Sequence, residues 1–253
     1  MKLYDMVFSP TGGTKKVADH LTSALEGDVT AVDLTDSKYD FDALHLTQED
    51  VAVISVTSYG GRVPAVAVER LSRVHGSGAR AVLVCVYGNR AYEDTLAELK
   101  DTAKQVGFQV IAAVAAVAEH SIARQFAAGR PDRQDAEQLS QFARQIQNKL
   151  SENDLTETAI PGKYPYKKAG GAGLVPKATK ECVRCGVCAA VCPVQAIDKD
   201  DPKKVNEQAC ISCMRCISVC PHAARKANPV MLMAVGVALK KVCSQRKECE
   251  LFL

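Results

Sequence analysis

Eight of the eleven cysteines in this chain lie in two runs that share one spacing. The first run is Cys182-Val-Arg-Cys185-Gly-Val-Cys188-Ala-Ala-Val-Cys192-Pro193. Its pattern returns 28 residues later in Cys210-Ile-Ser-Cys213-Met-Arg-Cys216-Ile-Ser-Val-Cys220-Pro221. Both runs read C-x2-C-x2-C-x3-C-P, a pattern with which bacterial proteins bind [4Fe–4S] clusters. The repeat therefore predicts two such clusters.

The spacing also indicates which cysteines share a cluster. Three thiolates spaced three residues apart can reach three corners of one cube from a short loop, which the proline ends. In two-cluster proteins the fourth cysteine of each run binds the other cluster. The residues between the ligands are mostly apolar, as expected of a shell that keeps water from the sulfurs. We therefore assign one cluster to Cys182, Cys185, Cys188 and Cys220, and the other to Cys210, Cys213, Cys216 and Cys192.

Structural zinc is the main alternative, because paired C-x-x-C units commonly bind it. A zinc site closes with four ligands and needs neither the x3-C-P tail nor its repetition. A disulfide framework is less favoured still, since residues 1–5 are not followed by the long apolar stretch of a secretory signal. We expect a soluble, cytoplasmic protein whose clustered cysteines bind iron.

Charge divides the chain into two halves. With 253 residues, 47% of them hydrophobic, the chain can bury one sizeable core and carry a smaller domain. Residues 1–150 have a net charge of −3 and residues 151–253 a net charge of +6. The basic half lacks the aromatic residues and arginine clusters of nucleic-acid-binding modules, so we expect no nucleic acid. The excess of positive charge offsets the negative clusters or steers an acidic redox partner. The longest apolar run, 230–239, is too short to cross a bilayer, and we expect no membrane insertion.

Strands and helices alternate along the first 150 residues. Apolar or alternating runs of strand length predict five strands, and helical patterns between and after them predict four helices. Strands separated by helices favour a parallel sheet covered on both faces. In a doubly wound sheet of this kind the ligand binds at the carboxyl ends of the strands. The predicted strands are 3–8, 29–34, 51–56, 81–87 and 110–118, and the predicted helices are 15–25, 65–74, 92–106 and 133–150.

Three loops at those carboxyl ends have an unusual composition. Loop 9–14 combines hydroxyl groups and glycines at the start of a helix, where free backbone N–H groups and the helix dipole favour a phosphate. A plain helix cap is the alternative, and the fingerprints of nucleoside triphosphate and dinucleotide sites are missing. Loops 57–64 and 87–92 each mix tyrosine with glycine and polar residues. They are either surface turns or two lips around a flat aromatic ligand.

With these loops, residues 1–150 resemble a flavodoxin. Ser9, Thr11, Gly12 and Thr14 match the S-x-T-G-x-T phosphate loop with which flavodoxins bind FMN. With the cysteine runs behind it, the whole chain is similar to the flavodoxin–ferredoxin fusion proteins of anaerobic bacteria and archaea. The resemblance implies a flavodoxin-like, doubly wound, five-stranded parallel sheet and a small α+β domain of the 2[4Fe–4S] ferredoxin type.

The resemblance also implies non-covalently bound FMN, with Tyr59 stacked on the ring and the backbone near Gly60 and Gly61 facing N5. The chain has no tryptophan, so the other face of the ring is left to Tyr92, to the ferredoxin domain or to nothing. His120 is a further candidate near the flavin, although an ordinary solvated or hydrogen-bonded histidine is the simpler interpretation. The expected FMN-binding residues are Ser9, Thr11, Gly12, Gly13, Thr14, Thr57, Ser58, Tyr59, Gly60, Gly61, Tyr87, Gly88, Asn89, Arg90 and Tyr92.

After the first domain we expect a linker over 151–178, the ferredoxin domain over 179–226, and a helix with a tail over 227–253. The linker is rich in proline, glycine and lysine, and its lysines either dock an acidic electron donor or are simply solvated. We expect the helix 228–242 to bury Met231, Leu232, Val235 and Leu239. Cys85, Cys243 and Cys249 are assigned no metal.

Both cofactors together would let the chain take single electrons through the clusters, collect two on FMN and deliver a pair. We expect an electron-transfer protein that acts on a ferredoxin- or flavodoxin-type partner or on a small acceptor. Three alternatives stay open: an enzyme that reduces a small acceptor such as a quinone, a carrier without a substrate, and an NAD(P)H-dependent flavin or quinone reductase.

Overall fold

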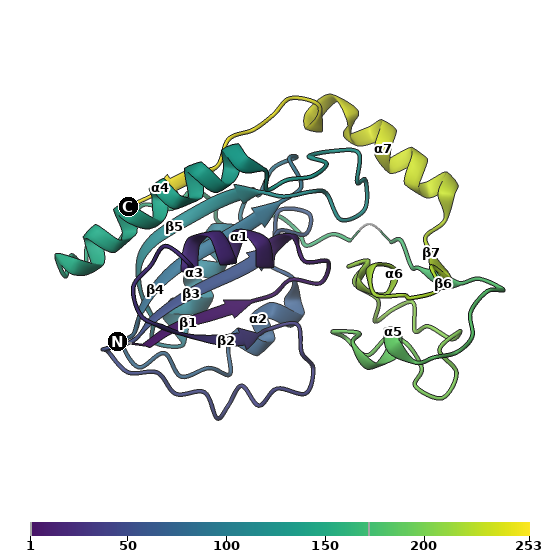
Figure 1. The fold of residues 1–253 in the computed structure, drawn as a ribbon, viewed down its shortest axis with the longest axis horizontal. Coiled ribbons are helices and arrows are strands. Elements are labelled where there is room, and N and C mark those ends of the chain that lie inside the picture. Colours follow the sequence, from purple (N-terminus) through teal and green to yellow (C-terminus); the bar gives the residue numbers. More distant parts are fainter. Residues whose placement is uncertain (1, 172) are drawn as a thin grey trace.

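The computed structural model describes residues 2–171 and 173–253, and its largest element is a six-stranded sheet with the order β2-β1-β3-β4-β5-β8. Five strands run parallel, and their order 2-1-3-4-5 is that of the flavodoxin-like doubly wound fold. This order confirms the predicted fold class (Figure 1). The parallel strands are β1 (Lys2–Val7), β2 (Asp28–Asp33), β3 (Val51–Thr57), β4 (Arg80–Tyr87) and β5 (Gln109–Val117).

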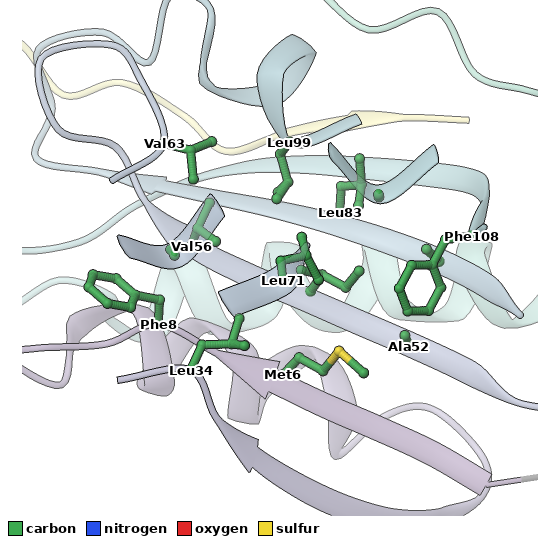
Figure 2. Close-up of a cluster of buried hydrophobic side chains, with 14 of the residues drawn as sticks. Met6, Phe8, Leu34, Ala52, Val56, Val63, Leu71, Leu83, Leu99 and Phe108 are labelled. Carbon is green, nitrogen blue, oxygen red and sulfur yellow. The ribbon is translucent and has the colours of Figure 1, made fainter. Parts of the chain in front are cut away.

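Helices cover both faces of the sheet, and each face has its own apolar core. Helices α1 (Gly13–Thr22) and α4 (Arg133–Ser151) pack on one face. Helices α2 (Ala65–Leu71) and α3 (Thr95–Gln105) pack on the other, where Figure 2 shows Phe8, Leu71 and Phe108 among the buried side chains. Because both faces are covered, the inner strands are nearly continuous apolar runs. These runs are the signal from which the sequence predicts the strands.

The sixth strand, β8 (Glu250–Phe252), was not predicted. It pairs antiparallel with β5, Ala113 opposite Phe252 and Ala115 opposite Glu250. The strand has three residues, too few to show an alternating pattern. It covers an edge of β5 that would otherwise be unpaired, so the C-terminal tail is part of the first domain's sheet.

The cysteine-rich part is built from short elements. Strands β6 (Lys177–Ala178) and β7 (Arg225–Lys226) pair antiparallel. Helices α5 (Val187–Ala190) and α6 (Arg215–Ser218) lie between these two strands in the chain. Strand β6 lies within the segment 151–178 that was expected to be linker. Ordered structure therefore begins before the first cysteine run.

Helix α7 (Pro229–Cys243) runs from the cysteine-rich part back to the flavodoxin-like domain (Figure 1). The Asn228 side chain accepts hydrogen bonds from the first backbone N–H groups and caps the helix. Leu232, Val235 and Leu239 are half-buried against neighbouring apolar residues. Met231 is 42% exposed, so its predicted burial is wrong: it lies off the packed stripe of the helix. No helix in residues 2–171 and 173–253 has the length and apolar character to cross a membrane.

Candidate functional site

A cavity of about 770 Å³ lies at the carboxyl ends of the parallel strands, where the fold predicts a ligand. All three loops singled out in the sequence contribute to its lining. The sequence therefore locates the cavity from strand ends and loop composition alone. The predicted residues that line it are Thr11, Gly13, Thr14, Thr57, Ser58, Tyr59, Gly60, Tyr87, Gly88 and Arg90.

The first loop offers backbone N–H groups to an anion. Gly12 has a left-handed backbone (φ 90°) and starts α1 without a side-chain cap. The Ser9 hydroxyl oxygen instead accepts a hydrogen bond from the Lys15 N–H, at 2.9 Å. Gly13 and Thr14, whose N–H groups belong to the first helical turn, both line the cavity. A phosphate group fits this arrangement, because uncapped N–H groups and the helix dipole both favour negative charge.

The second loop forms a tight hairpin. The Tyr59 N–H donates to the Arg62 carbonyl oxygen at 3.0 Å, and the Arg62 N–H donates to the Tyr59 carbonyl oxygen at 3.2 Å. Gly60 and Gly61 between them both have positive φ, 61° and 86°, as a two-residue hairpin turn of this twist requires. Half-buried Tyr59 thereby stands fixed at the cavity wall. Burial, with a smaller effect of nearby Cys213, raises the pKa of its hydroxyl, so the ring is uncharged at neutral pH.

Five predicted FMN-binding residues lie beside the cavity and make other contacts. Buried Asn89 donates from Nδ2 to the carbonyl oxygens of Cys243 and Gln245, at 2.7 and 2.8 Å, and holds the chain after α7. Tyr92 packs against Tyr87, with ring centroids 5.2 Å apart. These five residues shape the loops and do not line the cavity: Ser9, Gly12, Gly61, Asn89 and Tyr92.

Other walls of the cavity come from segments outside the three predicted loops, although His120 and a cover by the ferredoxin domain were among the expectations from the sequence. Loop 118–122, after β5, lines the cavity next to the loop after β4 and includes His120. Its position after a predicted strand could have identified it as part of the ligand site. The linker residues 167–171 and three residues of α7 close further sides. Ile211 and Ser212 of the second cysteine run complete the lining, so the cysteine-rich part forms one wall of the cavity.

A charged network ties the linker to the rim of the cavity. The Arg90 guanidinium and the Lys167 ammonium both contact the Glu93 carboxylate. These hydrogen bonds lower the pKa of Glu93 from 4.5 to about 2, so its carboxylate is charged at neutral pH. Asp94 accepts hydrogen bonds from the backbone N–H groups of Lys163 and Lys167, at 2.9 and 2.8 Å. The linker is therefore docked along residues 93–94.

The eight clustered cysteines fall into the two predicted sets. One small cavity is lined by Cys192, Cys210, Cys213 and Cys216, and a second by Cys182, Cys185, Cys188 and Cys220. In each set the fourth cysteine comes from the other run, as the crossover pattern requires. We call the set with Cys210 and Cys213 the inner set, and the set with Cys182 and Cys185 the outer set. Cys185 of the outer set is exposed, whereas Cys213 of the inner set is buried.

The backbone around the cysteines suits a negatively charged group. Equivalent positions in the two runs have positive φ: Arg184 (57°) matches Ser212 (54°), and Gly186 (77°) matches Met214 (62°). Such left-handed residues let successive N–H groups point into a common concavity. The crossing cysteines also accept backbone hydrogen bonds at Sγ, Cys192 from Ala196 and Cys220 from Ala224, both at 3.3 Å. The residues present therefore fit iron–sulfur clusters, whose sulfurs accept such bonds.

The inner set lies against the large cavity. Cys210 lines both the inner-set cavity and the large one. Arg70, on α2, is buried and donates to the carbonyl oxygen of Pro193 at 2.5 Å. Arg215 donates to the carbonyl oxygens of Ser9 and Pro10, at 3.3 and 3.2 Å. Arg215 thus ties the second cysteine run to the first loop, and Arg70 ties the end of the first cysteine run to α2.

Comparison with known proteins finds one matching family model and several similar solved structures. Residues 181–227 match the family model described as a 4Fe-4S dicluster domain. No curated protein sequence matches the chain. Similar solved structures include a flavodoxin from the domain Archaea, with 16% identity over 60% of this chain and 99% of that one and a TM-score of 0.44. The Streptococcus pneumonia TIGR4 flavodoxin has 23% identity over 58% and 99%, with a TM-score of 0.41. The two-electron reduced Megasphaera elsdenii flavodoxin has 18% identity over 56% and 98%, with a TM-score of 0.42.

The predicted combination is confirmed at this level: a domain with flavodoxin sheet order precedes a 4Fe–4S dicluster domain in one chain. The family match also favours iron–sulfur clusters over the zinc alternative.

Proposed function

We propose that this protein passes electrons from an external one-electron donor through two [4Fe–4S] clusters to FMN, which reduces a small molecule. The inner set and the outer set each hold one cluster, and the large cavity holds FMN. The single observation that carries the proposal is the position of Cys210, which lines both the inner-set cavity and the large cavity. A cluster bound there would be the immediate electron donor to FMN.

The two cysteine sets have different tasks in this proposal. Cys185 is exposed, and Val183 beside it is 62% exposed, so the outer cluster would be the one that an external partner approaches. The inner cluster, held by two buried and two half-buried cysteines, would lie between the outer set and the flavodoxin-like loops. FMN, when bound, supplies the conversion of single electrons into a pair. The protein binds its phosphate at Gly13 and Thr14 and shields its ring.

A small acceptor is favoured over a protein acceptor at the flavin. The cavity is covered by Ile211 and Ser212, by α7 and by the linker at 167–171. These segments leave a protein partner less of the flavin to approach than an uncovered flavodoxin-like domain would. A small unsaturated molecule such as a quinone would need only a path to the ring. The carrier without a substrate and the NAD(P)H-dependent reductase are the competing outcomes of the test below.

Rapid mixing of the anaerobic protein with a one-electron donor tests the route. The holoprotein should contain FMN and about eight iron atoms per chain, as two [4Fe–4S] clusters require. Cluster absorbance should bleach before the flavin is reduced, at a flavin rate that does not depend on protein concentration. Subsequent mixing with quinones should reoxidise the flavin in an enzyme and leave it reduced in a carrier. Faster flavin reduction by NAD(P)H than by the donor would overturn the proposed route.

The valine variant of Thr14 should bind FMN about ten- to a hundredfold more weakly. Thr14 is 4% exposed and lines the cavity at the first turn of α1. A hydrogen bond to a charged group contributes about 1.5–3 kcal/mol, which sets the range of the expected loss. Titration of the apoprotein with FMN, followed by flavin fluorescence, measures the dissociation constant.

Riboflavin is the control for this titration, because it lacks the phosphate. Its affinity should be nearly the same for the wild type and for Thr14→Val. The alanine variant of Ser9, whose hydroxyl caps Lys15 and is absent from the cavity lining, should lose less FMN affinity than Thr14→Val. Equal losses of riboflavin and FMN affinity in Thr14→Val would place the phosphate away from α1.

A further inference from the structure

His120 is held against one of the two lips of the cavity. It follows β5 and lines the cavity together with Gly88 and Arg90. A Cβ placed on Gly88 would lie 2.6 Å from Cδ2 of the His120 ring, closer than any real contact. The imidazole therefore occupies the space that a side chain at position 88 would need. This contact fixes the half-buried ring on the lip 87–91, and the hydrogen bonds of the ring agree with the simpler expectation of a hydrogen-bonded histidine.

Two backbone groups determine where the ring proton lies. The N–H groups of Ile122 and Ala123 both donate to Nδ1 of His120, each at 3.2 Å. An imidazole nitrogen accepts hydrogen bonds only when it carries no proton, so the neutral ring must carry its hydrogen on Nε2. In the described residues, no hydrogen bond from Nε2 to another residue is found. The Nε2–H group is left for a ligand of the cavity.

The surroundings of His120 also oppose a second proton. Protonation of Nδ1 would remove both backbone hydrogen bonds and turn three hydrogens toward one another. Burial, partly offset by the residue's own carbonyl group, lowers the pKa of His120, and the charge of Arg90 lowers it further. The other charged groups at this end of the cavity are paired: Arg90 with Glu93, and Glu119 with Arg124. His120 is thus neutral around pH 7, with Nδ1 as an acceptor of backbone hydrogen bonds and Nε2–H as its one donor.

We propose that His120 is a fixed neutral hydrogen-bond donor, through Nε2–H, to an oxygen or nitrogen acceptor of the ligand that fills the cavity. The inference rests on the proposed function, in which that ligand is the flavin ring of FMN. A donor at the ring favours the form that carries more negative charge, which is the reduced form. His120 therefore raises the reduction potential of bound FMN through this direct contact, without supplying a proton.

The tautomer can be tested without FMN. In the ¹⁵N-labelled apoprotein, Nδ1 of His120 should show the shift of an unprotonated acceptor and Nε2 that of a protonated nitrogen. This pattern should persist below pH 6.5, the ordinary pKa of histidine. A protonated Nδ1 at pH 7 would overturn the inference, whatever the protein binds.

The effect on FMN is tested by redox titration of the holoprotein. In His120→Ala, reduced FMN should lose about tenfold more affinity than oxidised FMN, a fall in the two-electron potential of about 30 mV. His120→Gln keeps an N–H donor, so its potential should lie close to that of the wild type. His45→Ala changes a histidine pair away from the cavity, and its potential should equal that of the wild type. Gly88→Ala, which displaces the ring, should lower the potential as well and is the second test if His120→Ala does not fold. Bound FMN with an unchanged potential in His120→Ala and Gly88→Ala would refute this inference alone, whereas a wild type that does not bind FMN would refute the proposed function too.

Discussion

Replacing Asp135 with asparagine should destabilise the protein by about 3–5 kcal/mol. The Asp135 side chain is fully buried in the first turn of α4. Its carboxylate accepts hydrogen bonds from Arg130 at 2.5 and 2.8 Å and from Arg246 at 2.9 Å. Asparagine has the same shape and no charge, so it would leave the buried Arg130 guanidinium without its counter-ion. The loss is large because the unpaired charge stays in a low-dielectric site.

The same substitution should loosen the C-terminal tail. Arg246 joins the tail to Asp135 and Asp132, and the segment beyond it forms β8. Hydrogen bonds from Arg246 hold the pKa of Asp132 well below its usual range, so this link persists at neutral pH. Hydrogen exchange in residues 244–253 should therefore accelerate in Asp135→Asn before the core of the sheet is affected.

Urea unfolding gives the free energy for this comparison, and Glu137→Gln is the matched control. Glu137 pairs with Arg133 on the same helix, where the two side chains are 61% and 94% exposed. Exposed pairs contribute about 0–1 kcal/mol, so the control should unfold almost like the wild type. Similar unfolding free energies for the two variants would show that the buried pair does not stabilise the fold.

The five parallel strands could be predicted to within a residue or so at each end. Strands β3, β4 and β5 are buried on both faces, so almost every side chain in them is apolar. Such a run can be predicted as a strand without knowing which strands pair with it. The start of α3 was harder to predict: the helical pattern begins at residue 92, whereas the helix begins at Thr95. Residues 93 and 94 instead hold the linker through their carboxylates.

The tail could not be predicted, because its structure depends on distant partners. Strand β8 exists through its pairing with β5, more than a hundred residues earlier. The exposed face of α7 escapes sequence analysis for a related reason: the helix is apolar on nearly every side, so composition does not show which side packs.

The candidate site also has a part that the sequence predicts and a part that it does not. Glycines and hydroxyl groups mark the three predicted loops, and cysteine spacing marks both cluster sets. Loop 118–122 has no glycine to mark it, although it lies at a strand end like the others. Arg70 and Arg215 donate to backbone carbonyl oxygens. Every residue has such an oxygen, so the sequence does not show which residues these arginines contact. Their role became visible only in three dimensions.

Cysteine variants of the two sets should separate the steps of electron transfer. The alanine variant of Cys185 removes one outer ligand and should lose about four of the about eight iron atoms, while FMN stays bound. Because the outer set is the exposed one, an external donor protein would then have to reach the buried inner cluster directly. We expect the reduction of FMN by that donor to slow by orders of magnitude, as followed by rapid mixing.

The alanine variant of Cys213, in the inner set, should behave differently from Cys185→Ala. Its outer cluster should still accept an electron quickly, since Cys185 and its neighbours are intact, but the flavin should stay oxidised because the connection at Cys210 has lost its cluster. Cys85→Ala, in the core of the sheet, is the control and should keep both the iron content and the rate. Flavin reduction at the wild-type rate in both cluster variants would mean that electrons enter at the flavin. The clusters would then carry electrons outward, and the exposed outer set would be an exit.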